Sequence, residues 1–226
     1  MSNTASRVAN YPCPPTPQIT QELEALGVEL VERGGTLVNG VRVLGKGTRG
    51  IVVGGIYRGL PVAVKIRRCD SPRPSMLHEA QMLRLANTVG VGPRLICATG
   101  NIIVMEEVVG VPLRRHTQIS DQQLAICIKD SLQQAIRLDG IGLDHGELSR
   151  AHSHVYQTGD GAKIIDFDSA STSRKPHNYN SLYAYYFMGR GELQQRARSI
   201  LPEYAPQELE CQSISKQAVT RRATET

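Results

Sequence analysis

The chain has 226 residues, a formal net charge of +5, 40% apolar residues, 4% aromatic residues and no Trp. This length and apolar content allow one large domain or two small lobes with a shared core, and they exclude a chain that is disordered throughout. The basic excess is too small and too scattered to indicate a nucleic-acid site.

Cysteine spacing and hydropathy limit the cellular setting. The five cysteines are odd in number, widely spaced and without a CxxC pair, so they indicate neither a disulfide framework nor a zinc finger. No apolar run approaches the ~20 residues of a membrane span. The first residues, MSNTASRVAN, lack the basic-then-apolar order of a signal peptide. We therefore expect a cytoplasmic protein without a membrane partner.

The first half of the chain is predicted to contain one helix followed by a sheet. Residues 1–16, with Ser, Thr, Asn and several Pro, are typical of a flexible lead-in. From Pro17, apolar residues recur at helical spacing and predict an N-terminal helix over 17–35. Residues 36–109 contain three β-rich runs, a helix within RPSMLHEAQMLRLAN and two further short strands. This pattern predicts a five-stranded antiparallel sheet with one helix.

The second half is predicted to be mainly helical over 110–211. A broad apolar stripe that starts near Ser120 predicts a long helix, and HVYQTGDGAKIIDFD predicts a hairpin. Short helices are expected in NYNSLYAYYFMG and ELQQRARSI. Residues 212–226 are polar and are predicted to form a flexible tail.

A glycine-rich pattern, GxGxxGxV, lies between two predicted strands. It consists of Gly45, Gly47, Gly50 and Val52 in the stretch GKGTRGIV. A dinucleotide-binding fold would need this pattern between a strand and a helix, whereas here a second strand follows. The position therefore favours a flap over nucleotide phosphates, with a plain glycine-rich hairpin as the alternative.

A lysine and a glutamate follow the flap. In VAVKI, Lys65 alternates with β-branched residues, so its side chain is expected on the opposite face of the strand from theirs. That face is either solvated or part of a phosphate-binding cleft. Glu79, on the next predicted helix, offers a carboxylate partner, although most helix glutamates are simply solvated.

The order of the motifs resembles that of the protein kinase superfamily: GxGxxGxV, VAVK, a Glu-bearing helix, VMEEVVG, HGEL and IIDFD. Residues 41–190 look most like the reduced, atypical RIO-type kinases and the small archaeal serine/threonine protein kinases. The resemblance implies an α+β, two-lobed protein-kinase-like fold, with the N-lobe over 36–109 and a reduced, mainly helical C-lobe over 110–211. It also implies ATP and Mg²⁺ or Mn²⁺ as cofactors, and an unidentified protein as substrate.

The resemblance further implies a role for each motif residue. Lys65 would bind the α- and β-phosphates, and Glu79 would be its ion-pair partner. Glu147 in HGEL would take the place of the catalytic Asp, and Asp166 in IIDFD that of the metal-binding Asp of DFG. Met105 would stand at the back of the adenine pocket. The implied ATP-binding residues are Gly45, Gly47, Gly50, Val52, Ala63, Lys65, Glu79, Met105, Glu106 and Val108.

Three departures from the kinase pattern bear on activity. Glu147 keeps a carboxylate but has one methylene more than Asp, which shifts the position of its oxygens. His152 stands where an Asn should hold the second metal, and imidazole suits Mn²⁺ better than Mg²⁺. Asp168 replaces the glycine of DFG. We expect Asp168 to join Asp166 and His152 as a metal ligand and to give a preference for Mn²⁺.

The leading hypothesis is an ATP-dependent phosphotransferase, a small atypical serine/threonine protein kinase with Lys65 and Glu147 as catalytic residues. Two other interpretations remain open. A nucleotide-binding pseudokinase would keep the cleft as a regulatory or scaffold module without competent chemistry. A transition-metal protein would instead use side chains of the stretch LDHGELSRAHSHV, namely His145, Glu147, His152 and His154.

Overall fold

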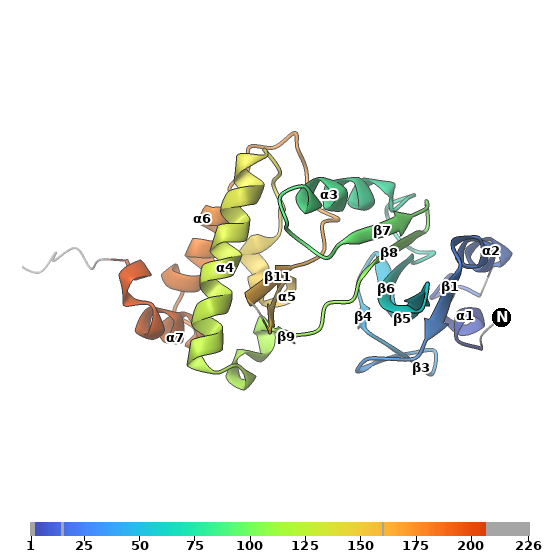
Figure 1. The fold of residues 1–226 in the computed structure, drawn as a ribbon, viewed down its shortest axis with the longest axis horizontal. Coiled ribbons are helices and arrows are strands. Elements are labelled where there is room, and N and C mark those ends of the chain that lie inside the picture. The colour runs from blue at the N-terminus through green and yellow to red at the C-terminus, as the bar shows by residue number, and fades with distance from the viewer. Residues whose placement is uncertain (1–2, 15, 160, 207–226) are drawn as a thin grey trace, which may run out of the picture.

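Strands dominate the first half of the chain and helices the second half in the computed structural model, which describes residues 3–14, 16–159 and 161–206 (Figure 1). The fold is α+β with antiparallel sheets, as the sequence predicts. Residues 106–110, which run from the end of β8 (Ile102–Glu106) to the start of β9 (Val111–Pro112), connect the two halves and are called the connector below. The predicted tail 212–226 lies outside the described residues. Within the described ranges, none of the helices combines the length and the hydropathy needed to cross a membrane.

The main sheet follows one path of antiparallel strands, in the order β1 (Val28–Val31), β5 (Gly50–Tyr57), β6 (Leu60–Arg67), β8 (Ile102–Glu106) and β7 (Leu95–Ala98), and β4 (Gly45–Lys46) pairs with β5. β5 and β6 form a hairpin whose turn residues, Arg58 and Gly59, both have positive φ, as a two-residue turn between twisted strands requires. Val53 lies opposite Val64 in this hairpin, and both are fully buried. β-branched residues at such positions favour the strand.

The membership of the sheet differs from the prediction. The helix expected over 17–35 is shorter, because α2 (Pro17–Leu26) ends at Gly27, whose φ of 67° is left-handed. The next residues form β1, the edge strand of the sheet. The run TLVNGVRV instead makes a separate hairpin of β2 (Thr36–Val38) and β3 (Val41–Val43). β1 is a strand because it pairs with β5, and β2 and β3 pair with each other; the local periodicity of the sequence does not report either pairing.

The N-terminal segment is ordered where the structure describes it. The flexible lead-in predicted over 1–16 contains α1 (Asn3–Val8), and Val8 is fully buried against the sheet core. Cys13 and Cys69 form a disulfide across 56 positions of sequence. The expectation that the cysteines form no disulfide is therefore wrong, because the fold brings together two residues whose spacing carries no signal. Cysteine usage accordingly provides no argument for a reducing compartment.

The helical half is built around α4 (Asp121–Gly140). Ser120 caps this helix, since its side chain accepts a hydrogen bond from Gln123 N and the Gln123 side chain returns to the Ser120 backbone. The elements that surround α4 are β9 (Val111–Pro112), η1 (Leu113–Gln118), η2 (Leu148–Arg150), α5 (Ala151–His154), β10 (Val155–Thr158), β11 (Gly161–Ile164), α6 (Asn178–Tyr183), η3 (Ala184–Met188), α7 (Glu192–Ile200) and η4 (Pro202–Tyr204).

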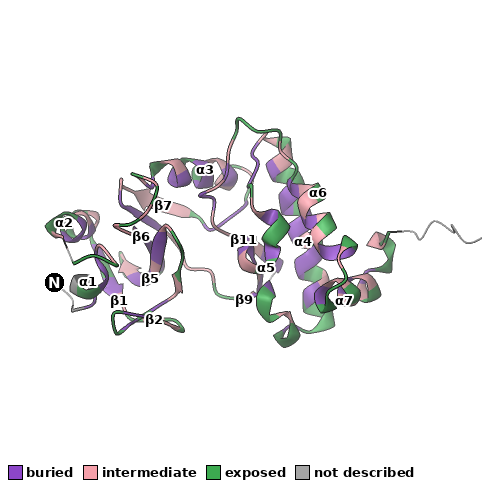
Figure 2. Ribbon diagram, turned by 180° about the vertical axis from the view of Figure 1, so that it is seen from behind, coloured by how far each residue is buried: buried purple, intermediate pink, exposed green. Residues whose placement is uncertain are grey.

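Two large apolar cores lie on either side of the connector, and buried residues line the inner faces of both halves (Figure 2). Helix α3 (Leu77–Asn87) joins them. Its residues Leu83 and Ala86 belong to the core of the helical half, whereas Ala80 packs against Ile103 of the sheet. Because α3 is held from both sides, Glu79 on its first turn has a fixed position between the two halves.

Candidate functional site

A cleft of about 710 Å³ separates the sheet from the helical half. It is lined by the β4–β5 loop, β6, α3, the connector and the segments around residues 147 and 166. The structure brings together in this cleft all the residues that the kinase resemblance singled out except His152. Those that line it are Gly45, Gly47, Gly50, Val52, Ala63, Lys65, Glu79, Met105, Glu106, Val108, Glu147, Asp166 and Asp168.

The glycine-rich loop folds as a tight connection between β4 and β5. Gly47 N donates a hydrogen bond to Gly50 O at 2.9 Å. A Cβ atom on Gly50 would lie 3.0 Å from Ile66 O and 3.3 Å from Cγ of Lys65. Glycine is therefore needed at this position because the loop approaches the base of the Lys65 side chain closely.

Lys65 is the centre of charge in the cleft. Its side chain leaves β6 on the face opposite Val64 and Ile66, and the residue is only 8% exposed. The ammonium nitrogen lies 2.6 Å from Glu79 Oε1 and 2.8 Å from Asp166 Oδ1. Burial alone would lower the pKa of Lys65, but the carboxylates of Glu79 and Asp166 outweigh it and the pKa is raised. Lys65 is therefore ionised at neutral pH.

The two carboxylates that hold Lys65 differ from each other. Burial raises the pKa of Glu79 to about 7, although the Lys65 ammonium opposes this shift. Burial also acts to raise the pKa of Asp166, but Lys65 outweighs it and the pKa falls to about 2. Asp166 therefore stays an anion at every pH of interest. Its φ of 71° lies in the left-handed region, which Asp adopts more readily than most non-glycine residues.

Glu147 is held from three directions. Its Oε1 accepts hydrogen bonds from Arg150 Nη2 at 2.9 Å and from Ser169 Oγ at 3.1 Å. Its Oε2 lies 3.1 Å from His154 Nε2. Burial lowers the pKa of His154, so the imidazole is neutral near pH 7. These contacts fix the carboxylate of Glu147 at the edge of the cleft.

Asp168 is bound by two arginines that the sequence interpretation missed. Arg49, from the glycine-rich loop, pairs with Asp168 Oδ2, and Arg73 Nε lies 3.2 Å from Oδ1. Both carboxylate oxygens are thus engaged by guanidinium groups. Arg49 could have been noticed because it lies inside the glycine-rich pattern, whereas Arg73, six positions before Glu79, belongs to none of the motifs.

His152 does not lie where the prediction needs it. Its side chain is exposed and stacks on Tyr185 with ring centroids 6.2 Å apart, and the cleft is lined instead by Ser153 and His154. The prediction of His152 as a metal ligand is therefore not supported by this geometry. Residues 151–154 form a single helical turn, so two histidines two positions apart face different directions.

His145 supports the cleft from beneath. It is fully buried, its Nε2 lies 3.1 Å from Ile165 O, and its ring packs edge-on against Phe167 with centroids 5.0 Å apart. Burial, followed by the neighbouring His154, lowers its pKa from 6.5 to about 4. A neutral His145 therefore positions the segment that carries Asp166.

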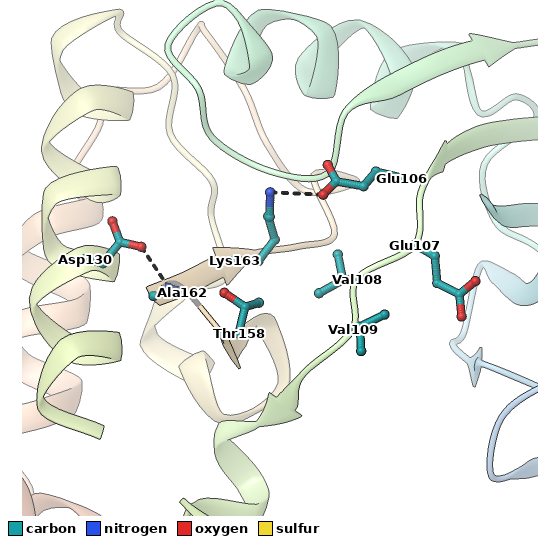
Figure 3. Close-up of a pocket in the computed structure, with 10 residues that line it drawn as sticks. Glu106, Glu107, Val108, Val109, Asp130, Thr158, Ala162 and Lys163 are labelled. Carbon is teal, nitrogen blue, oxygen red and sulfur yellow. Dashed lines mark hydrogen bonds and ion pairs between the residues drawn. The ribbon is translucent and has the colours of Figure 1, made fainter. Parts of the chain in front are cut away.

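A smaller pocket of about 380 Å³ lies beside the connector (Figure 3). Lys163 reaches across it to Glu106, with Nζ 3.4 Å from Oε1. Asp130 of α4 accepts a hydrogen bond from Ala162 N at 2.8 Å. These polar groups are paired with one another and tie β11 to α4 and to the connector. The larger cleft, which contains the charged cluster, is therefore the candidate functional site.

No family model and no curated protein matches the chain. The function must accordingly be argued from the geometry of the cleft. That geometry consists of a buried lysine between two carboxylates, a glycine-rich loop above them and a further carboxylate held at the edge.

Proposed function

We propose that the protein is an ATP-dependent phosphotransferase, a small atypical serine/threonine protein kinase that transfers the γ-phosphate to a hydroxyl group. The observation that carries this proposal is the pairing of Lys65 with both Glu79 and Asp166 at 2.6 and 2.8 Å in the main cleft. An ionised lysine held by one helix carboxylate and one strand-end carboxylate suits the binding of nucleotide phosphates beside a metal ion. The sheet-rich and helical halves would then be the two lobes of a kinase-like fold.

The size and polarity of the cleft support a nucleotide as ligand. A volume of about 710 Å³ lies within the range of ~300–1,000 Å³ that small-molecule sites occupy. Residues of the loop from Gly45 to Gly50 line the cleft together with Lys65. Met105 and the connector residues Glu106 and Val108 also line it, and the main chain of the connector would pair with adenine.

The donor set fits a divalent metal at Asp166 but not at Asp168. Asp166 has one oxygen on Lys65 and a second, Oδ2, turned towards His154. Asp168 has both oxygens on arginines, so it would have to exchange them before it could bind an ion. Mg²⁺ or Mn²⁺ bound with ATP would neutralise charge on the phosphates, and the chain would supply Asp166 to hold it.

Glu147 is the residue that we assign to the incoming hydroxyl. Its carboxylate lies at the edge of the cleft, oriented by Ser169 and His154, where it would accept the proton of the substrate hydroxyl. Lys65 would hold the phosphates of ATP in line with this hydroxyl. An unidentified protein with an accessible Ser or Thr is the substrate that this arrangement supports.

A pseudokinase is the second candidate, and two observations favour it. Glu147 already has Arg150, Ser169 and His154 as partners, so its oxygens are occupied before a substrate hydroxyl arrives. The contact between Arg49 and Asp168 also joins the glycine-rich loop to the floor of the cleft. In this alternative the protein would bind nucleotide and act as a regulatory module.

Transfer of label from γ-labelled ATP tests the proposal. The wild-type protein should label itself or a generic protein acceptor with Mg²⁺ or Mn²⁺, and Lys65→Ala and Asp166→Ala should each abolish the label. Lys129→Ala, an exposed lysine on α4, is the matched control and should keep it. Thermal stabilisation by ATP without any transfer would favour the pseudokinase instead. A protein that shows no phosphate transfer and no stabilisation by ATP would refute both candidates.

A further inference from the structure

His154 has an unused ring nitrogen that faces a carboxylate. The residue is 8% exposed, and its Nδ1 is buried without a hydrogen-bond partner among the described residues. This atom lies 4.0 Å from Asp166 Oδ2. A buried imidazole nitrogen without a partner is costly, so its place beside an anionic oxygen calls for a ligand between them.

The other ring nitrogen determines which atom carries the proton. His154 Nε2 lies 3.1 Å from Glu147 Oε2, which can only accept a hydrogen bond when it is ionised. A proton on Nε2 therefore satisfies this contact and leaves the lone pair of Nδ1 directed towards Asp166. A histidine that donates one N–H to a carboxylate and keeps the other nitrogen free has the arrangement of a metal ligand.

The distance between His154 and Asp166 also suits an ion. A separation of 4.0 Å is too long for a hydrogen bond. Two ligand atoms that share a transition metal at ~2.1 Å each can lie up to about 4.2 Å apart. One ligand atom each from Glu147, His154 and Asp166 can be chosen so that all lie within 4.8 Å of one another. Only small side-chain rotations would close the site on an ion.

The charge balance favours this site over the neighbouring acidic group. Glu79, Asp166 and Asp168 also lie within 4.8 Å of one another. Asp166 is common to both groups, and Lys65 holds its Oδ1 in either of them. The second group differs because Glu79 is also on Lys65 at 2.6 Å and both oxygens of Asp168 are on arginines. The pair of His154 Nδ1 and Asp166 Oδ2 has no such cation between its two atoms.

We propose that His154 Nδ1 and Asp166 Oδ2 bind a divalent transition-metal ion of the Mn²⁺ class, with Glu147 as the residue that orients His154. A mixed nitrogen and oxygen donor set selects Mn²⁺ over Mg²⁺, which prefers oxygen ligands alone. Water completes the coordination in the protein alone. Binding of the metal to the protein alone does not depend on the proposed function. Replacement of the bound water by phosphate oxygens of ATP would deepen the proposed function and rests on it.

Electron paramagnetic resonance with Mn²⁺ alone, in the absence of nucleotide, tests the inference. The amplitude of the signal from free Mn²⁺ gives the affinity of the protein for the ion. Modulation of the electron spin echo reports whether a nitrogen atom is bonded to the ion. We expect nitrogen modulation in the wild-type protein and its change to the ¹⁵N pattern after labelling with ¹⁵N-histidine. His154→Asn should remove the modulation and weaken Mn²⁺ binding at least tenfold. His152→Asn, the matched control two positions away, should leave both unchanged.

The outcomes separate this inference from the proposed function. Mn²⁺ bound without nitrogen modulation in the wild-type protein, or with modulation that persists in His154→Asn, would overturn the inference. The ¹⁵N-histidine experiment shows in the wild-type protein whether a histidine binds the ion, and His154→Gln replaces His154→Asn to decide which one if His154→Asn does not fold. Nitrogen modulation in a protein that neither binds ATP nor transfers phosphate would refute the proposed function and leave the metal site standing.

Discussion

The ammonium nitrogen of Lys65 lies 2.8 Å from Asp166 Oδ1, although 101 positions of sequence separate the two residues. Lys65 belongs to the main sheet and Asp166 follows the last strand of the helical half, so the ion pair joins the two halves of the molecule across the cleft. Glu79 completes the group from α3. Any change to one of these side chains should affect both the folding free energy and the binding properties of the cleft.

Lys65→Met should lower the free energy of unfolding by about 3 kcal/mol at ~pH 8, because it leaves the Glu79 carboxylate buried without its partner. The pKa of Glu79 is raised to about 7, so its proton is bound in the folded state at lower pH and lost as the pH rises. The penalty should therefore shrink at ~pH 5.5. Chemical denaturation at the two pH values measures it.

The double variant Lys65→Met/Glu79→Leu is the control for this experiment. It removes the buried pair of Lys65 and Glu79 and should recover most of the lost stability, because a buried ion pair can be replaced by apolar side chains at little cost. Asp166 keeps its charge, but its side chain is 39% exposed, so water can solvate it. A double variant as unstable as Lys65→Met would mean that the ion pair is not the source of the effect.

Glu147→Gln should slow phosphate transfer by ~10²–10⁴-fold, because an amide cannot accept the proton of the substrate hydroxyl. The affinity for ATP should stay within about twofold, since Glu147 is placed at the hydroxyl rather than at the phosphates. Single-turnover transfer and nucleotide titration measure the two quantities. Glu203→Gln, an exposed glutamate that pairs with Lys129, should change neither of them. Equal rates for Glu147→Gln and the wild-type protein would remove Glu147 from the mechanism.

The stability of the protein should fall by about 3 kcal/mol between ~pH 6.5 and ~pH 4 because of His145. The pKa of this residue is lowered from 6.5 to about 4 by burial, so the unfolded chain binds a proton in this range and the folded protein does not. The contribution of neutral His145 to the free energy of unfolding is complete above pH 6.5 and is lost as the pH falls to 4. His145→Gln should flatten the pH dependence, measured by denaturation across this range. If the stability of His145→Gln depended on pH as steeply as that of the wild-type protein, the loss of stability would have to come from other titrating groups.

Reduction of the disulfide between Cys13 and Cys69 should destabilise the protein by about 4 kcal/mol, because the bond closes a loop of 56 positions. Thermal unfolding with and without a dithiol reductant measures the change. Alkylation followed by mass spectrometry should show two cysteines protected until the reductant is added. The double variant Cys13→Ser/Cys69→Ser controls for other effects of the reductant. Its midpoint of thermal unfolding should match that of the reduced protein. Equal midpoints for the oxidised and reduced protein would contradict this prediction.

Gly92→Ala and Gly90→Ala form a matched pair at left-handed positions. Both glycines have positive φ, 82° and 69°, so each alanine should cost about 1 kcal/mol for its backbone conformation. A Cβ on Gly92 would also lie 2.8 Å from Phe167 Cε2 and 2.9 Å from Leu83 Cδ1, whereas nothing lies within 4 Å of Gly90. We expect Gly92→Ala to be destabilised by about 2 kcal/mol more than Gly90→Ala in chemical denaturation. Equal losses would show that the core around Phe167 yields to the extra methyl group.

Local patterns in the sequence predicted the residues of the cleft well. Val64 and Ile66 alternate with Lys65, and the structure buries them on the face opposite the cleft. The glycine-rich pattern and Asp166 of IIDFD line that same cleft, and their roles there stay predictions. The face of Lys65 and the tight turn could be predicted because alternation along a strand and glycine at a turn depend on the nearest neighbours in the chain.

The partners of those residues were decided by the tertiary structure. β1 is a strand and not the end of a helix because it pairs with β5, and Cys13 lies beside Cys69 because the N-terminal segment packs against the residues after β6, where Cys69 N donates a hydrogen bond to Tyr11 O. Helical periodicity and cysteine spacing contain no information about either contact. Long-range pairing, which is settled by packing and not by local preference, determined these features.

The same division applies to the chemistry of the site. The sequence by itself determined that carboxylates and histidines are concentrated in LDHGELSRAHSHV and IIDFD. The fold decided that His154, and not His152, faces Asp166, and that Arg49 and Arg73 occupy Asp168. The physical reason is that α5 makes one turn, so a shift of two residues reverses the direction of a side chain, and ion pairs form between whichever charges the packed elements bring within reach.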